Sequence, residues 1–436
     1  MKKSKLLLTL VVFVLFGFQT IMATDGYFRH GYGIKYSAIG GAGTALSLSS
    51  VGAANNPAGL AFLGNRYDVN VGLFSPNRSF TVTGNPSQME GTFGLMPGTV
   101  ESESNYFPMP TLGANWMLNE TMALGVMFYG NGGMNTDYPS AVFFDPNSKS
   151  TGVNIEQMFF GVTYAIEFIE GHSLGITPIF VFQRFTAKGL FSFSDFSQDP
   201  AALTGNQVST STGFGGRVGY MGKLLPYLTI GASYQMKTAM SKFEEYRGLF
   251  AEDGDFDIPA SWNVGIAVTP AKDWTFAFDV KQILYSGVKS INNVLDPMKL
   301  APVFPDGQGG FVPNPNFTPL GSENGAGFGW DDVMAYKFGV IYDGVEGWTF
   351  MAGFSHNDNP IPDSEVLFNI LAPGVVQNHI TCGITKQLNN NNEITIGFMY
   401  APEGSVSGTN PLDPPANQGI ELNMSQWQLE LGYAFH

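Results

Sequence analysis

Three basic side chains, Arg217, Lys281 and Lys337, lie within stretches of sequence that alternate between apolar and polar or small residues. Each falls on the polar or small face of its stretch, so all three are expected to point into an enclosed interior. A partly desolvated cation needs an anionic partner, and a carboxylate head group on an apolar molecule is one such partner. Asp279 and Glu430 share this face, so the alternative is that the basic residues only form ion pairs that brace the interior.

Apolar side chains also occupy the inward face. Phe159, Met351 and Met399 have the same parity as the basic residues in their own stretches. An apolar tract with a few cations suits a substrate with a carboxylate head and an acyl tail. We therefore treat these three residues, together with Arg217, Lys281 and Lys337, as candidate substrate-binding residues.

The stretches that position these residues have the length of membrane-crossing strands. In "DWTFAFDVKQI" (273–283), Trp274 and Phe278 lie on one face and Asp279 and Lys281 on the other. About ten residues with this alternation are typical of a tilted strand crossing the hydrocarbon layer. Fourteen such segments are found: 67–84, 105–118, 121–130, 153–167, 171–187, 212–223, 226–238, 258–270, 273–284, 332–345, 347–357, 374–387, 390–401 and 424–436.

The connections between these segments alternate strictly between short and long. Short turns on one side and long loops on the other are typical of an outer-membrane barrel, whereas a soluble sandwich would not show this alternation. Aromatic residues gather at segment ends, as in interfacial girdles. The sequence therefore predicts an all-β fold, a fourteen-stranded antiparallel transmembrane β-barrel over residues 67–436.

The N-terminus predicts export. Residues 1–23 combine three lysines, an apolar run and a final small residue, Ala23, as in a secretory signal peptide. Cys382 is the single cysteine, so no internal disulfide is expected. The formal net charge of −15 argues against a nucleic-acid partner. No apolar run of helix-spanning length follows the signal peptide, which argues against a helical membrane protein.

Catalytic and metal sites are not expected. The five histidines are scattered, and the sequence has neither an HExxH nor a GxSxG motif. The acidic run "DGDFD" (253–257) lacks the spacing of a calcium loop and is better explained as a solvated loop. We predict a protein that is not an enzyme and that binds neither cofactor nor metal.

Residues 24–66 precede the first strand and are rich in glycine and alanine but poor in charge, unlike a disordered tail. A fourteen-stranded barrel leaves a lumen too wide for its own side chains to fill. A plug, or hatch, folded inside the lumen explains this composition, and a periplasmic linker is the alternative. Its motif "NNPAG" comprises Asn55, Asn56, Pro57, Ala58 and Gly59, and we expect Asn56 to cap a bend with its side chain.

The segment "GYGIKYSAIGGAG" followed by "NNPAG" resembles the N-terminal hatch of the FadL-type outer-membrane transporters. The stretches "FYGNGGMNTDY" (128–138), "GFGWDDVMAYKFGVIY" (327–342) and "GFSHNDNPIP" (353–362) resemble further family blocks in the same order. The resemblance implies a monomeric barrel that moves long-chain fatty acids or other hydrophobic molecules without an energy source. It also implies that Tyr27, Phe28 and Arg29, at the start of the hatch, lie near the ligand.

Family members have an inward kink with a side opening in the third strand. Here Asn131, Gly132 and Gly133 are the residues that could form it. The expected location is the outer membrane of a Gram-negative bacterium, with membrane lipid and the barrel assembly machinery as partners. The leading function is passive uptake of long-chain fatty acids. An aromatic-hydrocarbon channel, a general porin and a surface adhesin remain alternatives.

Overall fold

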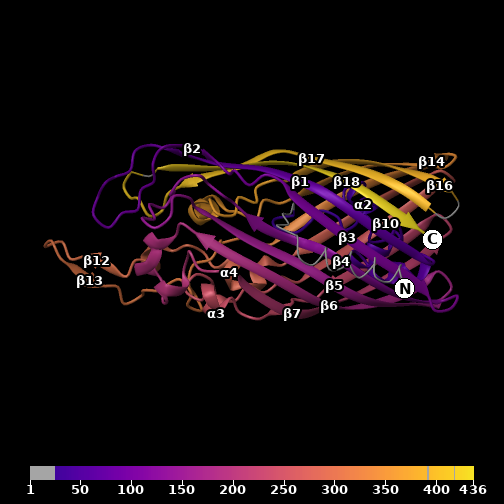
Figure 1. Ribbon diagram of the computed structural model, residues 1–436, viewed down its shortest axis with the longest axis horizontal. Helices are drawn as coiled ribbons and strands as arrows, with labels where there is room; N and C mark the ends of the chain where they lie inside the picture. Colours follow the sequence, from indigo (N-terminus) through magenta and orange to yellow (C-terminus); the bar gives the residue numbers. More distant parts are fainter. Residues whose placement is uncertain (1–24, 390–391, 417) are drawn as a thin grey trace, which may run out of the picture.

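The computed structural model of the chain describes residues 25–389, 392–416 and 418–436 (Figure 1). Its first strand, β1 (Arg66–Thr83), pairs antiparallel with its last, β18 (Gly419–Phe435), from Tyr67 opposite Phe435 to Thr83 opposite Gly419. This pairing closes the sheet into a barrel and confirms the predicted fold class. The predicted signal peptide, residues 1–23, lies outside the described residues.

Fourteen strands form the wall in the described part of the chain, and each corresponds to one predicted segment. Between β1 and β18 they are β3 (Phe107–Met117), β4 (Met122–Asn135), β5 (Gly152–Ile169), β6 (His172–Lys188), β7 (Ser209–Leu225), β8 (Leu228–Gln235), β10 (Ser261–Ala271), β11 (Trp274–Ile283), β14 (Val333–Val345), β15 (Trp348–Asn357), β16 (Asn378–Asn389) and β17 (Asn392–Thr409). Two short strands extend the wall: β2 (Gly98–Glu101) pairs with β1, and β9 (Ala239–Met240) pairs with β7.

The alternation in each strand separates a lipid-facing surface from an interior. In β11 the side chains of Asp279 and Lys281 are buried, whereas Trp274 and Phe278 are exposed. Apolar side chains on the outer face satisfy a hydrocarbon environment, and hydrogen bonds between neighbouring strands satisfy most of the backbone of the wall. Cys382 is exposed on the outer surface, as its parity predicts.

Several strands, including the last two, are longer than predicted. The predicted segments 390–401 and 424–436 are too short, because β17 continues to Thr409 and β18 begins at Gly419. The added part of β17 carries Glu403, Ser405 and Ser407 as exposed or half-buried residues, so its outer face is no longer apolar. Apolar alternation marks only the part of a strand that crosses lipid, and this hairpin extends beyond it.

The long loops gather at one end of the barrel, and the C-terminus lies toward the other (Figure 1). They contain η3 (Phe191–Phe196), η4 (Pro200–Ala202), η5 (Glu244–Tyr246), α3 (Ala251–Gly254), η6 (Tyr285–Gly287), α4 (Lys289–Asn292), α5 (Pro297–Leu300), β12 (Val303–Pro305), β13 (Phe311–Pro313), η7 (Asp363–Glu365) and α6 (Val366–Asn369). The β12–β13 hairpin projects farthest from the barrel (Figure 1). Among the described residues, each helix is too short or too polar to cross a membrane.

The N-terminal segment, residues 25–65, lies against the inner face of the wall. It contains α2 (Ile34–Ser37), which packs on β17 and β18, η1 (Ser50–Ala54), which packs on β3 and β4, and η2 (Pro57–Phe62), which packs on β5, β6 and β7. Nearly all of its residues up to Ala61 are buried. The segment therefore contacts strands on several sides of the barrel interior.

Asn56 fixes the bend within this segment. Its Oδ1 accepts a hydrogen bond from the Ala58 amide at 3.1 Å, and Pro57 occupies the first position of η2. Its Nδ2 donates to the carbonyl of Thr44 at 2.7 Å and to that of Tyr220 in β7 at 2.8 Å. One side chain thus caps η2, closes the segment on itself and ties it to the wall. Asn55, Ala58 and Gly59 are buried in the same bend.

Glycines in the wall make room for the segment. A Cβ atom on Gly219 of β7 would overlap the side chain of Asn56 and lie 2.8 Å from Cδ of Pro57. A Cβ atom on Gly175 of β6 would overlap the backbone of Pro57 and Ala58. The inward-facing small residues therefore serve close approach of two backbones.

Candidate functional site

The wall is incomplete between its second and third strands, β3 and β4. Their pairing runs from Met117 opposite Ala123 and ends at Thr111 opposite Tyr129. Beyond Thr111, β3 pairs with β1 alone, and it contains Pro108 and Pro110, which have no amide hydrogen to donate. The remainder of β4, from Gly130 to Asn135, has no partner in β3.

A β-bulge lies in β4 at this gap. Its register with β5 shifts between Gly130 and Gly132, so Asn131 is the additional residue. The Asn131 side chain accepts a hydrogen bond from the hydroxyl of Tyr32 at 2.6 Å and donates to Gln157 at 3.2 Å. The predicted distortion at Asn131, Gly132 and Gly133 is therefore present as a bulge at the edge of the gap.

The start of the N-terminal segment covers the free edge of β4. Phe28 forms an antiparallel bridge with Gly132. The Arg29 amide donates to the carbonyl of Asn131 at 3.0 Å, and the Gly133 amide donates to that of Tyr27 at 3.1 Å. Three residues predicted to lie near the ligand thus occupy the place in the wall where a neighbouring strand is missing.

Asp25 holds this part of the segment to two of the predicted basic residues. Its Oδ2 lies 2.8 Å from Nζ of Lys337 and 3.1 Å from Nζ of Lys281, and the carboxylate is fully buried. Burial by itself raises the pKa of Asp25, but the two ammonium groups outweigh it and hold that pKa below its ordinary value. Lys281 and Lys337 therefore form ion pairs within the protein, in line with the bracing alternative, although their partner is Asp25 and neither Asp279 nor Glu430.

The other carboxylates of the interior are also engaged. Asp279 Oδ2 accepts hydrogen bonds from the amides of Gly43 and Thr44 at 2.7 and 2.8 Å and from the Thr44 hydroxyl at 2.8 Å. Glu430 lies 2.9 Å from the guanidinium of Arg29. Both carboxylates tie the N-terminal segment to the wall.

Arg217 differs from these cations. It is buried, with 3% of its surface exposed, and points inward from β7. Its Nη2 donates to Oε1 of Gln235, whereas Nε and Nη1 have no hydrogen-bond partner. Its guanidinium carbon lies 5.9 Å from the ring centre of Tyr32. Among the described residues, Arg217 has no carboxylate partner, which is costly for a buried cation.

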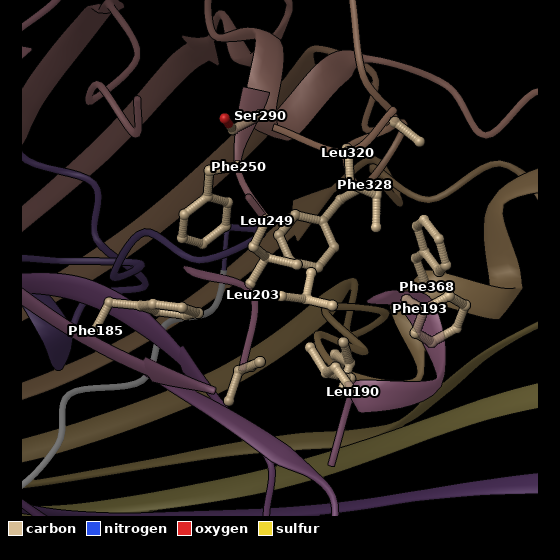
Figure 2. Close-up of a pocket in the computed structure, with 14 residues that line it drawn as sticks. Phe185, Leu190, Phe193, Leu203, Leu249, Phe250, Ser290, Leu320, Phe328 and Phe368 are labelled. Carbon is tan, nitrogen blue, oxygen red and sulfur yellow. The ribbon is translucent and has the colours of Figure 1, made fainter. Parts of the chain in front are cut away.

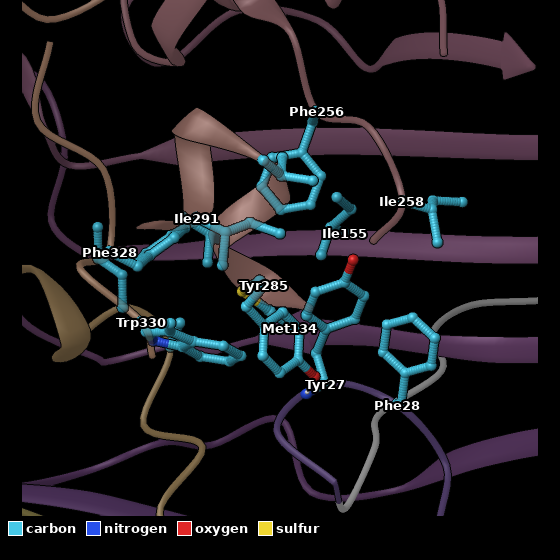
Figure 3. Close-up of a cluster of buried hydrophobic side chains, with 14 of the residues drawn as sticks. Tyr27, Phe28, Met134, Ile155, Phe256, Ile258, Tyr285, Ile291, Phe328 and Trp330 are labelled. Atoms are coloured by element: carbon cyan, nitrogen blue, oxygen red, sulfur yellow. Dashed lines mark hydrogen bonds between the residues drawn. The ribbon is translucent and has the colours of Figure 1, made fainter. Parts of the chain in front are cut away.

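Aromatic rings pack around Tyr27 (Figure 3). The ring of Tyr27 lies 5.4 Å from that of Tyr285, 6.1 Å from Trp330 and 6.2 Å from Phe256, measured between ring centres. The Trp330 indole N–H donates to Oδ1 of Asn369 at 2.6 Å, which fixes its orientation. These rings belong to the N-terminal segment and to two different loops, so the loops close over the interior.

An apolar cavity lies farther out among the loops (Figure 2). The volume of this cavity is about 50 Å³. Its lining is Val153, Phe185, Leu190, Phe193, Leu203, Leu249, Phe250, Ser290, Leu320, Ala326, Gly327, Phe328, Phe368 and Leu371. Ser290 carries the single side-chain hydroxyl in this lining, so the cavity suits hydrocarbon.

Aromatic contacts connect this cavity with the gap. Phe250 lines the cavity and lies 4.9 Å from Phe256, which in turn contacts Tyr27. Phe328 also lines the cavity and lies 6.3 Å from Trp330. A continuous series of ring contacts therefore runs from the loop cavity to Tyr27, beside the bulge in β4.

The remaining predicted residues, Phe159, Met351 and Met399, lie in different parts of the interior. Phe159 is buried beside the ring of Tyr129 at 5.3 Å, close to the bulged part of β4. Met351 packs with Ala38 and Ile39, beneath the N-terminal segment. Met399 is buried in the large apolar core. The structure thus brings Phe159 and Arg217 toward the gap, and it places Met351 away from it.

Several residues of this arrangement were not predicted from the sequence. Asp25 lies outside any strand, so parity assigns it no face. Tyr285 and Phe256 come from long loops, where no periodicity indicates direction. Tyr129 directly precedes Gly130 in β4 and shares the inward parity of Met127. This parity is the one signal that could have identified it.

A comparison with protein families matches residues 28–419 to the model described as outer membrane protein transport protein (OMPP1/FadL/TodX). The chain belongs to this family. It is thus a transport protein of the Gram-negative outer membrane, and the family match agrees with the prediction that it is not an enzyme. A comparison with curated protein sequences finds no match.

Solved structures of the OMPP1/FadL/TodX family have the same fold. The toluene transporter TodX of Pseudomonas putida gives a TM-score of 0.64 at 16% identity, with 93% of this chain and 99% of TodX covered. A FadL homologue of Pseudomonas aeruginosa gives 0.65 at 13% identity, covering 94% and 99%. The toluene transporter TbuX of Ralstonia pickettii gives 0.59 at 15% identity, covering 93% and 99%. At these identities the likeness concerns the fold alone.

Proposed function

We propose that this member of the OMPP1/FadL/TodX family is a passive channel for hydrophobic molecules that carry a carboxylate, with long-chain fatty acids as its substrates. The observation that carries the proposal is Arg217. A buried guanidinium with two unpartnered nitrogens and no carboxylate partner favours an anionic ligand. Three other cations of the interior, Arg29, Lys281 and Lys337, are instead paired with Glu430 or Asp25.

The proposed route begins at the apolar cavity among the loops. It continues along Phe256, Tyr27 and Trp330 to the gap between β3 and β4 and then sideways into the bilayer. The aromatic contacts and the missing strand pairing support this route. A path straight through the lumen is less favourable, because residues 24–66 act in this proposal as a hatch that packs closely against wall glycines such as Gly219.

An aromatic-hydrocarbon channel is the second candidate. The lining of the loop cavity supports it, because phenylalanine and leucine make up most of that lining and Ser290 is its one hydroxyl-bearing side chain. The chemistry of this lining suits toluene as well as an acyl chain. Arg217 separates the two candidates, since a neutral ring offers the guanidinium no acceptor.

The test is uptake of radiolabelled oleate and toluene by cells that lack their own transporter, with this protein or with an empty vector. We expect oleate to enter faster with the protein. Faster entry of toluene alone would support the second candidate. If neither compound enters faster, the uptake proposal is wrong.

A further inference from the structure

The carboxylate bound by Lys281 and Lys337 belongs to the N-terminal segment. Asp279 lies directly opposite Lys337 in the strand register, yet its Oδ2 is bound by Gly43 and Thr44. The two lysines instead share Oδ2 of Asp25. The segment that covers the gap therefore supplies the carboxylate with which the two lysines of the wall form ion pairs.

The hold on Asp25 is incomplete. Oδ1 of this buried carboxylate has no hydrogen-bond partner. A carboxylate that uses both oxygens toward cations is bound more strongly than one that uses a single oxygen. Another carboxylate that reaches the lysines can therefore replace Asp25 as their partner. The lysines then stay paired, and the cost of an unpaired buried charge is avoided.

Arg217 and Lys281 lie near the same aromatic ring, that of Tyr32. Its guanidinium carbon is 5.9 Å from the ring centre of Tyr32, and Nζ of Lys281 is 5.8 Å from the same centre. A carboxylate bound at Arg217 is thus on the same aromatic ring as the lysine that holds Asp25. The two cationic positions thus have the Tyr32 ring as a common neighbour.

Two backbone hydrogen bonds join Asp25 to Phe28, which covers the gap. The Asp25 amide donates to the carbonyl of Phe28 at 2.7 Å, and the Phe28 amide donates to that of Asp25 at 3.3 Å. Phe28 is the residue paired with Gly132 across the gap. Displacing Asp25 from the lysines consequently removes the ion pairs next to the bridge between Phe28 and β4.

We propose that Asp25 is a specificity-determining residue, an internal carboxylate that a carboxylate-bearing substrate must displace before residues 27–29 leave the gap. A ligand shifts such an equilibrium only through a difference in its affinity for the two states. An acid binds the two lysines only when Asp25 has left, whereas a neutral hydrocarbon gains nothing from that exchange. This inference rests on the proposed function and adds a discrimination step to it.

The test compares oleate with its neutral methyl ester, which shares the acyl chain. In the wild type we expect uptake of oleate to exceed that of methyl oleate. In Asp25→Asn the uptake of the ester should rise about tenfold relative to that of oleate. A tenfold change corresponds to about 1.4 kcal/mol. Asp68→Asn is the matched control, because Asp68 is also a buried carboxylate that holds the N-terminal segment, through Ser50, but it pairs with Arg66 of β1 and with neither lysine.

An unchanged ester-to-oleate ratio in Asp25→Asn, or an equal change in Asp68→Asn, overturns the inference while the uptake of oleate by the wild type still supports the proposed function. If the wild type does not accelerate oleate uptake, the proposed function itself fails.

Should Asp25→Asn not assemble, hydrogen exchange in the wild type decides. Oleate should increase exchange of the Gly133 amide, which donates to Tyr27, and methyl oleate should not. Equal exchange with both compounds overturns the inference.

Discussion

Phe28 in the N-terminal segment and Gly132 in β4 form an antiparallel pair of the non-hydrogen-bonded type. The two hydrogen bonds that flank the pair run from Arg29 to Asn131 and from Gly133 to Tyr27. In such a pair the two Cα atoms lie about 4.5 Å apart, with the side chains close together. The free edge of the incomplete wall is thus satisfied by a segment that is not a strand of the barrel.

This pair provides a direct way to fasten the gap. Cysteines at Phe28 and Gly132, in a chain with Cys382→Ser, have a Cα separation suited to a disulfide. Under oxidising conditions we expect uptake of oleate to fall to the level of cells without the protein, and a reductant should restore it. Uptake that continues with the disulfide formed would contradict a route through this gap. The single-cysteine variants serve as controls for the substitutions themselves.

Close contact between the N-terminal segment and the wall predicts a sensitive glycine. Gly219→Ala places a methyl group against Asn56 and Pro57, so we expect overpacking to cost about 1–3 kcal/mol. Gly287→Ala is the matched control, since a Cβ atom there has no neighbour within 4 Å. Thermal unfolding and entry of a large hydrophilic antibiotic should both change in Gly219→Ala alone. Equal behaviour of the two variants would show that the segment does not pack here as described.

The acidic run in the loop after β9 predicts a pH dependence. Burial raises the pKa of Asp255 to about 6 from 3.8, and Asp257 and Glu252 act in the same direction against Lys237. Because the folded-state pKa lies above the unfolded value, the stabilising contribution is complete below about pH 4 and is lost as the pH rises through about 6. Protection of the Phe243 and Gly254 amides from hydrogen exchange should therefore decrease over this range.

Asp255→Asn should remove this dependence, because an amide does not titrate. Asp306→Asn, at an exposed carboxylate in the β12–β13 hairpin, should leave it unchanged. Protection that rises with pH in the wild type would mean that Asp255 is ionised at low cost in the folded loop.

The strands could be predicted from the sequence because lipid on one side and an interior on the other impose a period of two. Parity correctly placed Lys281, Lys337 and Arg217 inside. It could not show their partners. The partner of both lysines, Asp25, lies in a segment without periodicity, and the contact joins positions more than 250 residues apart.

The loops were the least predictable part. Phe250 was a recognisable apolar residue in a long loop, but its place in the cavity depends on contacts with Phe185 and Phe256. Phe311, a similar residue by sequence, is exposed on the β12–β13 hairpin. Composition does not separate these two cases, because each depends on how several loops pack together.

Binding of oleate to purified protein carrying Arg217→Gln tests the central claim most directly. Loss of a hydrogen bond to a charged group predicts a binding free energy weaker by about 1.5–3 kcal/mol for oleate, with no change for methyl oleate. Arg247→Gln, at an exposed arginine paired with Asp199 in the loops, should bind both like the wild type. Equal affinity of the wild type and Arg217→Gln for oleate would contradict the claim that Arg217 receives the carboxylate of the substrate.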